Sequence, residues 1–457
     1  MKFRNKSAAL VAAILTLATA LFTSSSTVLG DTMTPVSVQP KLETPSNFDD
    51  DAGGNADADD PAIWVHPFSP SKSLVVATLK NAGLAVYDLK GVQLQSIAAP
   101  PAPTPNDSPG RFNNVDLLYS FVLNNQKVDL AVVSDRGSDK LRIYSINPQA
   151  ASSDQPPLTD VTTANVPFIF SSSQTQVNEQ ATAYGLAVYR DPKSGRSFAY
   201  VSQRNRTAIA VVELLQTSQG QITYRNLKQI NLPSKFELPN GTSWTPCEDP
   251  GELPQVEGMV VDQKRGILYA GQEDVGIWKI KLSLGSTRPI LLDKVREFGV
   301  PYTYDSVEEE CKIDFNNDPG YGGKNLSADV EGLTIYYAND NEGYLLASSQ
   351  GDNTFAVYER EGNNRFVGSF ALVDTTTVDG VQESDGAAVI NVPLDREFPL
   401  GLFVTQDGEN TPEVLDDAGE VRANTNFKFI PWQSIANTFP KPLQIKPDGW
   451  NPRDDDD

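Results

Sequence analysis

The segment Val330-Glu331-Gly332-Leu333-Thr334-Ile335 is one of six similar phrases in this chain. In most copies an acidic residue leads into a short run of apolar residues, and the leading residues lie 54 to 74 positions apart. Self-similarity on this scale is typical of a propeller or solenoid with one structural unit per repeat, whose heads would converge on one axis. The other copies are Asp60-Pro61-Ala62-Ile63-Trp64, Val115-Asp116-Leu117-Leu118-Tyr119, Tyr184-Gly185-Leu186-Ala187-Val188-Tyr189, Val256-Glu257-Gly258-Met259-Val260 and Ser384-Asp385-Gly386-Ala387-Ala388-Val389.

Each repeat contains short β-forming runs separated by turn residues. In the first repeat these runs cover residues 62–65, 74–78, 84–87 and 93–97, with Pro, Gly, Asn and Ser between them. Such spacing is typical of all-β proteins. Four strands in each of six repeats predict an all-β chain folded as a six-bladed β-propeller, a single domain over residues 44–440.

The two ends of the chain differ from this pattern. Residues 1–30 combine Lys2, Arg4 and Lys6 with a short apolar run, which predicts a secretory signal peptide cleaved after Ala20 or Gly30. The alternative, a membrane anchor, is disfavoured because the run is shorter than the roughly 20 residues of a span. Residues 441–457 are rich in Pro and Asp, and we expect a disordered or merely draped acidic tail.

The net charge limits the kinds of binding partner, and the cysteine content predicts a disulfide. Residues 31–457 carry 34 basic and 59 acidic side chains, a net charge of −25 that repels nucleic acid and anionic membranes. We expect a secreted monomer that binds neither. Cys247 and Cys311 stand in insertions before two neighbouring repeats, so a disulfide is expected, with free thiols or a metal–thiolate site as alternatives.

Several classes of hydrolase are excluded by composition. His66 is the one histidine in the sequence, and a histidine phosphatase or a zinc protease needs more than one. A Ser-His-Asp triad would have to use His66, which follows a predicted strand in a Pro-flanked turn and is poorly placed for it. The sequence has no Gly-x-Ser-x-Gly elbow, P-loop or Cys-x5-Arg motif. The abundant groups are carboxylates, gathered near the repeat heads, and oxygen-rich sets of this kind suit Ca²⁺. The alternative for each acid is a strand cap or an Asx-turn.

Three cations follow the second strands of the first three repeats. Lys80, Arg136 and Arg204 stand at corresponding positions, where the later repeats have Glu273-Asp274, Asp352 and Asp407. A site with a metal ion on its acidic side and with Lys and Arg on its opposite side suits an anionic phosphoryl substrate. The alternative is ordinary solvated surface cations.

Longer strings of the chain resemble the β-propeller phytases. Those that carry the resemblance are Asp59-Asp60-Pro61-Ala62-Ile63-Trp64, Gly83-Leu84-Ala85-Val86-Tyr87, Asn113-Asn114-Val115-Asp116, Glu257-Gly258-Met259, the segments 329–338 and 343–351, and Gly401-Leu402-Phe403-Val404-Thr405-Gln406-Asp407-Gly408-Glu409-Asn410. The resemblance implies a six-bladed propeller that removes phosphate from phytate, inositol hexakisphosphate, with several Ca²⁺ ions and lower inositol phosphates as products.

The resemblance also implies roles for individual residues. Active-site calcium ions, which carry and activate the attacking water, would be bound by Asp59, Tyr184, Glu257, Glu273, Asp329, Glu331 and Asp385. Phosphate oxygens would contact Lys80, Arg136 and Arg204, the last standing where the family has lysine. Structural calcium would be bound by Asp60 with the carbonyls of Pro61 and Val115, and elsewhere near Asp379, Glu409 and Asn410. Two departures, Asn205 for a glutamate and Asn81 for a second lysine, affect the phosphate pockets but not the calcium ligands.

Two other functions are compatible with parts of this pattern. Other six-bladed propellers hold a catalytic calcium at their axis, so a calcium-dependent lactonase is the rival enzyme. A non-catalytic extracellular binding propeller is the other rival. A lactonase needs fewer calcium ions and no cationic rim, and a binding module needs no open metal position.

Overall fold

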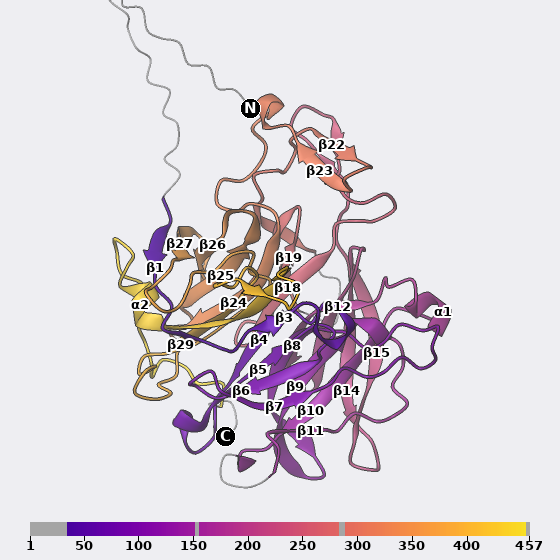
Figure 1. Ribbon diagram of the computed structural model, residues 1–457, viewed down its shortest axis with the longest axis vertical. Helices are drawn as coiled ribbons and strands as arrows, with labels where there is room; N and C mark the ends of the chain where they lie inside the picture. The colour runs from indigo at the N-terminus through magenta and orange to yellow at the C-terminus, as the bar shows by residue number, and fades with distance from the viewer. Residues whose placement is uncertain (1–33, 151–154, 283–287, 454–457) are drawn as a thin grey trace, which may run out of the picture. The chain divides into compact units, whose positions relative to one another are not determined.

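Six sheets of four or five strands are arranged in a ring in the computed structural model, which describes residues 34–150, 155–282 and 288–453 (Figure 1). The first strand of each sheet contacts the first strands of the two neighbouring sheets, and the sixth sheet contacts the first. The predicted all-β, six-bladed propeller is therefore confirmed. The predicted signal peptide over residues 1–30 lies outside the described residues. Within the described part of the chain, no helix is long and apolar enough to cross a membrane.

Each sheet, or blade, starts at one of the six repeated phrases. We number the blades in chain order, with the innermost strand first. Their strands are β4 (Pro61–Trp64), β5 (Leu74–Thr78), β6 (Leu84–Tyr87) and β7 (Gln93–Ile97) in blade 1; β8 (Phe112–Leu123), β9 (Gln126–Asp135), β10 (Lys140–Ile146) and β11 (Leu158–Asp160) in blade 2; β12 (Ala183–Arg190), β13 (Ser197–Gln203), β14 (Ala208–Gln216) and β15 (Ile222–Asn231) in blade 3; β18 (Val256–Asp262), β19 (Ile267–Gln272), β20 (Gly276–Lys281) and β21 (Ile290–Lys294) in blade 4; β24 (Val330–Tyr337), β25 (Gly343–Ser349), β26 (Thr354–Glu359) and β27 (Phe366–Leu372) in blade 5; and β28 (Ala387–Ile390), β29 (Leu402–Asp407) and β32 (Asn424–Pro431) in blade 6.

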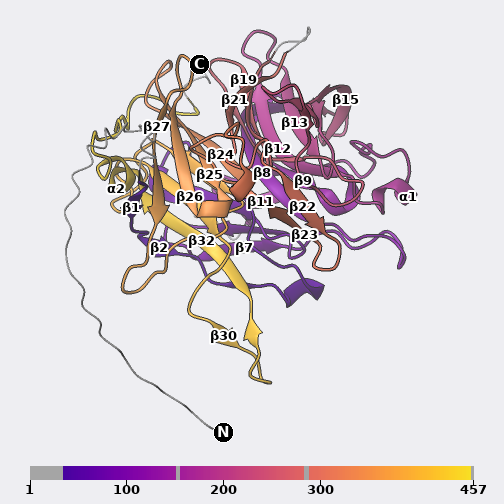
Figure 2. The same cartoon turned by 90° about the horizontal axis from the view of Figure 1, so that it is seen from above.

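The N-terminal segment completes the last two blades. Strand β2 (Leu42–Glu43) pairs antiparallel with β32 as the outer strand of blade 6, and β3 (Asn47–Phe48) pairs with the same strand. Strand β1 (Val36–Val38) adds to β27 in parallel, and Figure 2 shows β1 near the helix α2 (Trp432–Ala436). Strands that pair with the blades are therefore present from Val36 on. These runs of two or three residues are too short to be predicted as strands from periodicity.

The C-terminal segment is packed rather than disordered as far as residue 453. Leu443 and Trp450 are buried, and the Trp450 ring stacks on Tyr337 with 4.0 Å between ring centroids. The Arg453 guanidinium bonds the carbonyl oxygen of Val65 and pairs with Asp129. Two apolar anchors and one ion pair therefore fix this proline-rich stretch against the propeller. Residues 454–457 lie outside the described residues.

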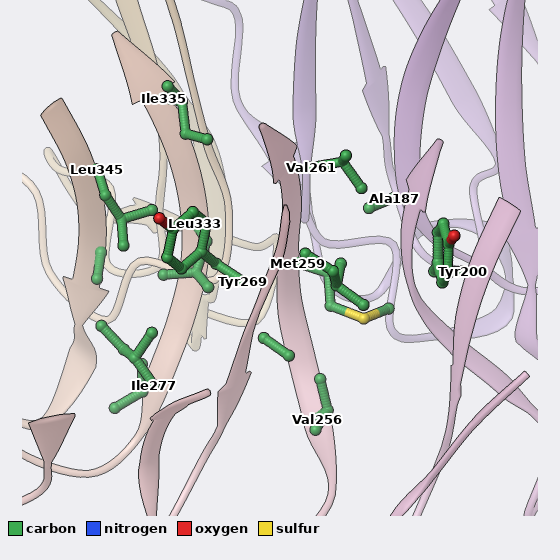
Figure 3. Packing of buried hydrophobic residues seen from close by; sticks show 14 of the residues in the cluster. Ala187, Tyr200, Val256, Met259, Val261, Tyr269, Ile277, Leu333, Ile335 and Leu345 are labelled. Carbon is green, nitrogen blue, oxygen red and sulfur yellow. The ribbon is translucent and has the colours of Figure 1, made fainter. Parts of the chain in front are cut away.

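Apolar side chains from both faces of the strands fill the space between neighbouring blades. Figure 3 shows Met259 and Val261 of β18, Leu333 and Ile335 of β24 and Ala187 of β12 in one such cluster. All five residues of β5 are buried, which explains why its sequence is a continuous apolar run rather than an alternating one. Burial on both faces makes each blade depend on its neighbours.

The remaining elements lie outside the blades. The disulfide between Cys247 and Cys311 is present, with 5.9 Å between the two Cα atoms, so the predicted pairing is confirmed. Cys311 belongs to β23, the second strand of one of three small hairpins in the described residues. The hairpins are β16 (Phe236–Glu237) with β17 (Ser243–Trp244), β22 (Tyr302–Asp305) with β23 (Glu310–Ile313), and β30 (Val414–Leu415) with β31 (Val421–Arg422). Two short helices, α1 (Gln174–Val177) and α2 (Trp432–Ala436), also lie outside the blades.

Candidate active site

The heads of the innermost strands are brought together by close backbone contacts between blades. A Cβ atom on Gly185 would overlap the carbonyl oxygen of Glu257 in the next blade, and one on Gly258 would overlap that of Glu331. Strand pairing shifts register at the same place in both blades, between Ala183 and Leu186 and between Val256 and Met259. The repeated glycine after the head residue therefore lets successive heads stack around the axis, and the irregular pairing turns their side chains toward it.

Carboxylates from blades 4 and 5 form one largely buried cluster. Carboxylate oxygens of Glu257, Glu273 and Glu331 lie within 4.8 Å of one another, and Glu273 forms a second such group with Asp274 and Asp329. Counting partners among the described residues only, Oε1 of Glu273 and Oε2 of Glu331 are buried and accept no hydrogen bond. Buried carboxylates without donors are costly, and oxygen groups at this spacing fit a hard cation such as Ca²⁺.

Asp59 extends this cluster toward the first blade. Its side chain is fully buried, and neither carboxylate oxygen has a partner in the described part of the chain. Burial raises its pKa well above the usual range, and Glu257 and Asp385 raise it further. The same two causes, burial and neighbouring carboxylates, raise the pKa of Glu273 and Glu331, and raise that of Asp329 to about 6. Cations in the cluster would remove the mutual repulsion that underlies these shifts.

Glu257 is held by two donors from other blades. The Tyr184 hydroxyl donates to Glu257 Oε2 at 2.5 Å, and the Asn113 amide donates to Oε1 at 2.6 Å. Tyr184 is itself buried under the Arg136 guanidinium, which lies 5.3 Å from the centre of its ring. Tyr184 thereby connects the acidic cluster to the predicted cationic residues.

Lys80 lies on the acidic side of the site as well as beside the cations. Its ammonium contacts Asp385 Oδ2 at 3.1 Å, and Asp385 also accepts from Gln350. Burial alone would lower the pKa of Lys80, but the carboxylates of Asp385 and Asp59 outweigh it and raise the pKa, so Lys80 is charged.

Arginines line the side next to Lys80. Arg136 starts the short 3₁₀ turn η3 (Arg136–Ser138), and its Nε is buried without a partner among the residues described. Arg204 lies close enough to Arg136 that, after burial, repulsion by Arg136 is a further cause lowering the pKa of Arg204. Asn205 donates to Glu252, which lies near Arg204. The structure thus brings Lys80, Arg136 and Arg204 to the same region as the carboxylates.

Two further sets of residues were predicted to bind structural calcium, and they differ. Asp60 and Val115 do meet, but through the Val115 N–H, which donates to Asp60 Oδ2 at 3.0 Å, with Pro61 next to Asp60 at the start of β4. In the second set, the side-chain oxygens of Asp379 and Asn410 already have partners. Asp379 and Asn410 both bind the ammonium of Lys428, while Glu409 is exposed.

Lys428 supplies a positive charge within this second set. Its side chain is fully buried and also pairs with Glu43 at 2.5 Å and Asp407 at 3.2 Å. The ammonium of Lys428 therefore lies among three carboxylates and an amide oxygen, near the place where the resemblance implies a structural calcium. Lys428 lies 49 residues from Asp379 in sequence, so spacing could not reveal the contact. Asp407, expected on the acidic side of the site, is thus paired with Lys428, and Asp352 is paired with Arg296.

The structure adds residues that the sequence analysis missed. Arg111 immediately precedes β8 and lies near Arg136, Asp57 and Asp59. Glu248, next to the disulfide-bonded Cys247, lies near Asp274 and Asp329, and burial followed by the charge of Asp329 raises its pKa to about 8, although a hydrogen bond with Asp274 acts in the opposite direction. The adjacency of Arg111 to the Asn113-Asn114-Val115-Asp116 string was the one available signal for it, whereas Glu248 lies in an insertion without any repeat pattern.

Comparisons with known proteins agree with this arrangement of residues. The family model described as Phytase matches residues 6–239 and 314–457. The chain belongs to the phytase family. This phytase-family chain is 34% identical over 408 residues to the 3-phytase of Bacillus subtilis (strain 168), covering 87% of the chain and 85% of that protein.

Solved structures were also compared with this phytase-family chain. A protein of unknown function from Bacteroides thetaiotaomicron is 8% identical, with a TM-score of 0.42, covering 87% of this chain and 75% of that one. A putative 6-phosphogluconolactonase from Bacteroides fragilis is 14% identical, with a TM-score of 0.35, covering 68% and 69%. At these scores the likenesses carry no conclusion about chemistry.

Proposed function

We propose that the protein is a secreted, calcium-dependent 3-phytase that releases phosphate from phytate and yields lower inositol phosphates. Membership of the phytase family and the similarity to a 3-phytase support the reaction. The observation that carries the metal assignment is the set of buried carboxylate oxygens without donors, on Asp59, Glu273 and Glu331. This proposal accounts for both halves of the site, because a highly anionic substrate needs cations on every side.

The donor set fits calcium. We propose that the ligands are carboxylates from blades 1, 4, 5 and 6 together with the Tyr184 hydroxyl, and that a further ion binds near Asp60, Pro61 and Val115. When bound, Ca²⁺ supplies positive charge that offsets both the carboxylates and the phosphate oxygens, and it lowers the pKa of a coordinated water. The proposed active-site ligands are Asp59, Tyr184, Glu257, Glu273, Asp329, Glu331 and Asp385.

The side chains of the protein supply the rest of the chemistry. Lys80, Arg136 and Arg204 hold the phosphate by charge-assisted hydrogen bonds and stabilise charge on its oxygens as the ester bond breaks. The hydrogen bonds from Tyr184 and Asn113 fix the orientation of Glu257. Both cysteines are bound in the disulfide and the ring of His66 bonds the carbonyl oxygen of Pro148, so neither a thiol nor an imidazole is offered as nucleophile, and attack by water without a covalent intermediate suits the geometry.

Export and the oligomeric state belong to the same proposal. The disulfide suits an oxidising compartment, and the charge of residues 31–457 argues against binding to nucleic acid or membranes. We propose a monomer, because the innermost strands of the six blades already complete the site within one chain.

A substrate panel tests the reaction. Purified protein with Ca²⁺ should release phosphate from phytate far faster than from 4-nitrophenyl phosphate, because one phosphate cannot engage all the cations. It should leave a gluconolactone unchanged. Lactone hydrolysis without phosphate release from phytate would instead assign the site to a lactonase, and inactivity toward all three would favour a binding propeller.

A further inference from the structure

Arg111 stands between two of the proposed phosphate-binding residues. The backbone N–H of Phe112 donates to the carbonyl oxygen of Lys80 at 3.1 Å, and the N–H of Arg136 donates to the carbonyl oxygen of Arg111 at 2.8 Å. These two bonds tie the chain at Arg111 to both neighbouring cations. A further bond, from the Arg111 N–H to Asp135 Oδ1 at 3.1 Å, fixes the same backbone.

The guanidinium of Arg111 is poorly satisfied by the protein. One of its terminal nitrogens donates to Asn81 Oδ1 at 3.3 Å, which is a long and neutral contact. Its Nε is buried and has no partner in the part of the chain that the structure describes, and the same holds for Nε of Arg136. No described ion pair within 4.0 Å joins either guanidinium to a carboxylate. Buried N–H donors of a charged group that bind nothing indicate a missing acceptor.

The two guanidinium groups also repel each other. Burial lowers the pKa of Arg111, and the charge of Arg136 lowers it further, although Asp59 and Asp57 act in the opposite direction. Two half-buried arginines with unused donors are stabilised together by an anion that accepts from both. A phosphate group has three oxygens and the charge for this, and Arg binds it through its planar fork of donors.

We propose that Arg111 is a substrate-binding residue, which shares one phosphate of the inositol phosphate with Arg136. This inference rests on the proposed function. It adds to the site a cation that leaves the chain from the first residue before β8, rather than from the end of a second strand. Arg111 is then a third cation, next to Lys80 and Arg136, on the side of the site proposed to bind phosphate.

Kinetics and binding of two variants test this role. Arg111→Ala should raise KM for phytate at least tenfold and weaken binding of inositol hexasulfate, a charged analogue without phosphate esters, by a similar factor. Arg111→Lys should recover part of both losses, because it restores the charge but not the fork. Arg365→Ala, which removes an exposed arginine paired with Glu359 on blade 5, is the matched control and should change neither quantity.

A substrate-binding role and a purely structural role for Arg111 predict different melting temperatures. If Arg111 binds substrate, the melting temperature of Arg111→Ala in the absence of anions should not fall, because the substitution removes the repulsion by Arg136. A lower melting temperature with unchanged KM and unchanged hexasulfate binding would overturn the proposal. If the wild-type protein releases no phosphate from phytate, the proposed function fails. Hexasulfate binding that is equal in wild type and Arg111→Ala rejects the role of Arg111 whether or not that function holds.

Discussion

The ammonium of Lys80 lies 3.1 Å from Asp385 Oδ2, so the first cation of the proposed phosphate side is paired with a head residue of the acidic side. The contact joins blades 1 and 6, which are the two ends of the repeat array. It means that the two halves of the site are one electrostatic unit. Substrate and metal binding should therefore both depend on this pair.

Replacing Lys80 by Met should weaken catalysis on phytate without weakening calcium binding. We expect kcat/KM for phytate to fall at least tenfold, since a charge-assisted contact contributes about 1.5–3 kcal/mol. Calcium affinity should stay equal or rise, because Asp385 loses its competing partner. Lys312→Met, on the exposed β22–β23 hairpin, is the control. Steady-state kinetics with calorimetric titration of Ca²⁺ measures both quantities, and a large loss of calcium affinity in Lys80→Met would refute this assignment.

Glu257 and Glu331 should be needed for calcium and for turnover, but not for the fold. Substitution of either by Gln keeps the side-chain volume and removes a charge from the cluster. We expect kcat to fall by two orders of magnitude or more and the calcium concentration needed for activity to rise, with an unchanged circular dichroism spectrum. Glu213→Gln, on the outer part of blade 3, should remain active. Near-normal turnover of both cluster variants would place the metal elsewhere.

The calcium-free protein should lose stability as the pH rises. The folded-state pKa is about 6 for Asp329 and about 8 for Glu248, above the ordinary values of 3.8 and 4.5. The folded state therefore binds these protons more tightly than the unfolded state does, which raises the free energy of unfolding. This stabilisation is complete below the ordinary pKa values and is lost as the pH rises past 6 and then past 8. Urea unfolding in chelator at pH 5, 7 and 9 should show a decreasing free energy of unfolding, and the decrease should be smaller with Ca²⁺. A calcium-free protein that is more stable at pH 9 than at pH 5 would contradict the clustering.

Lys428 should stabilise blade 6 in place of a metal. Its substitution by Met leaves Glu43, Asp379 and Asp407 without their buried cation, and breaking such a contact costs about 3–5 kcal/mol. Lys41→Met, which breaks an exposed pair with Glu397, should cost no more than about 1 kcal/mol. Chemical denaturation of both variants makes the comparison. Equal small losses would show that the carboxylates are neutralised by something else.

The repeated phrase predicted the fold because it marks the innermost strand of every blade. Strands β5, β6 and β7 lie where the apolar runs of the first repeat placed them. The closure by β1 and β2 was not predictable, since their partners β27 and β32 lie more than 300 residues away and the runs are only two or three residues long.

The candidate site was predictable where the residues head or end a repeated strand. Glu257 and Glu331 needed only the knowledge that repeat heads converge, whereas Asp59, next to the head residue Asp60, was assigned through the resemblance to the β-propeller phytases. Lys428 could not be placed in the same way, because its effect depends on which carboxylates surround a buried ammonium. Arg111 and Glu248 come from irregular segments, whose position depends on loop contacts and on the disulfide rather than on repeat spacing.

Phosphate release from phytate as a function of free Ca²⁺ tests the central proposal most directly. The metal-free protein should release no phosphate above background, and added Ca²⁺ should restore turnover and raise the melting temperature over the same concentration range. Mg²⁺ should restore little, because it requires a smaller and stricter octahedral site. Full phytate hydrolysis in excess chelator, with an unchanged melting curve, would contradict the assignment of the acidic cluster as a calcium site.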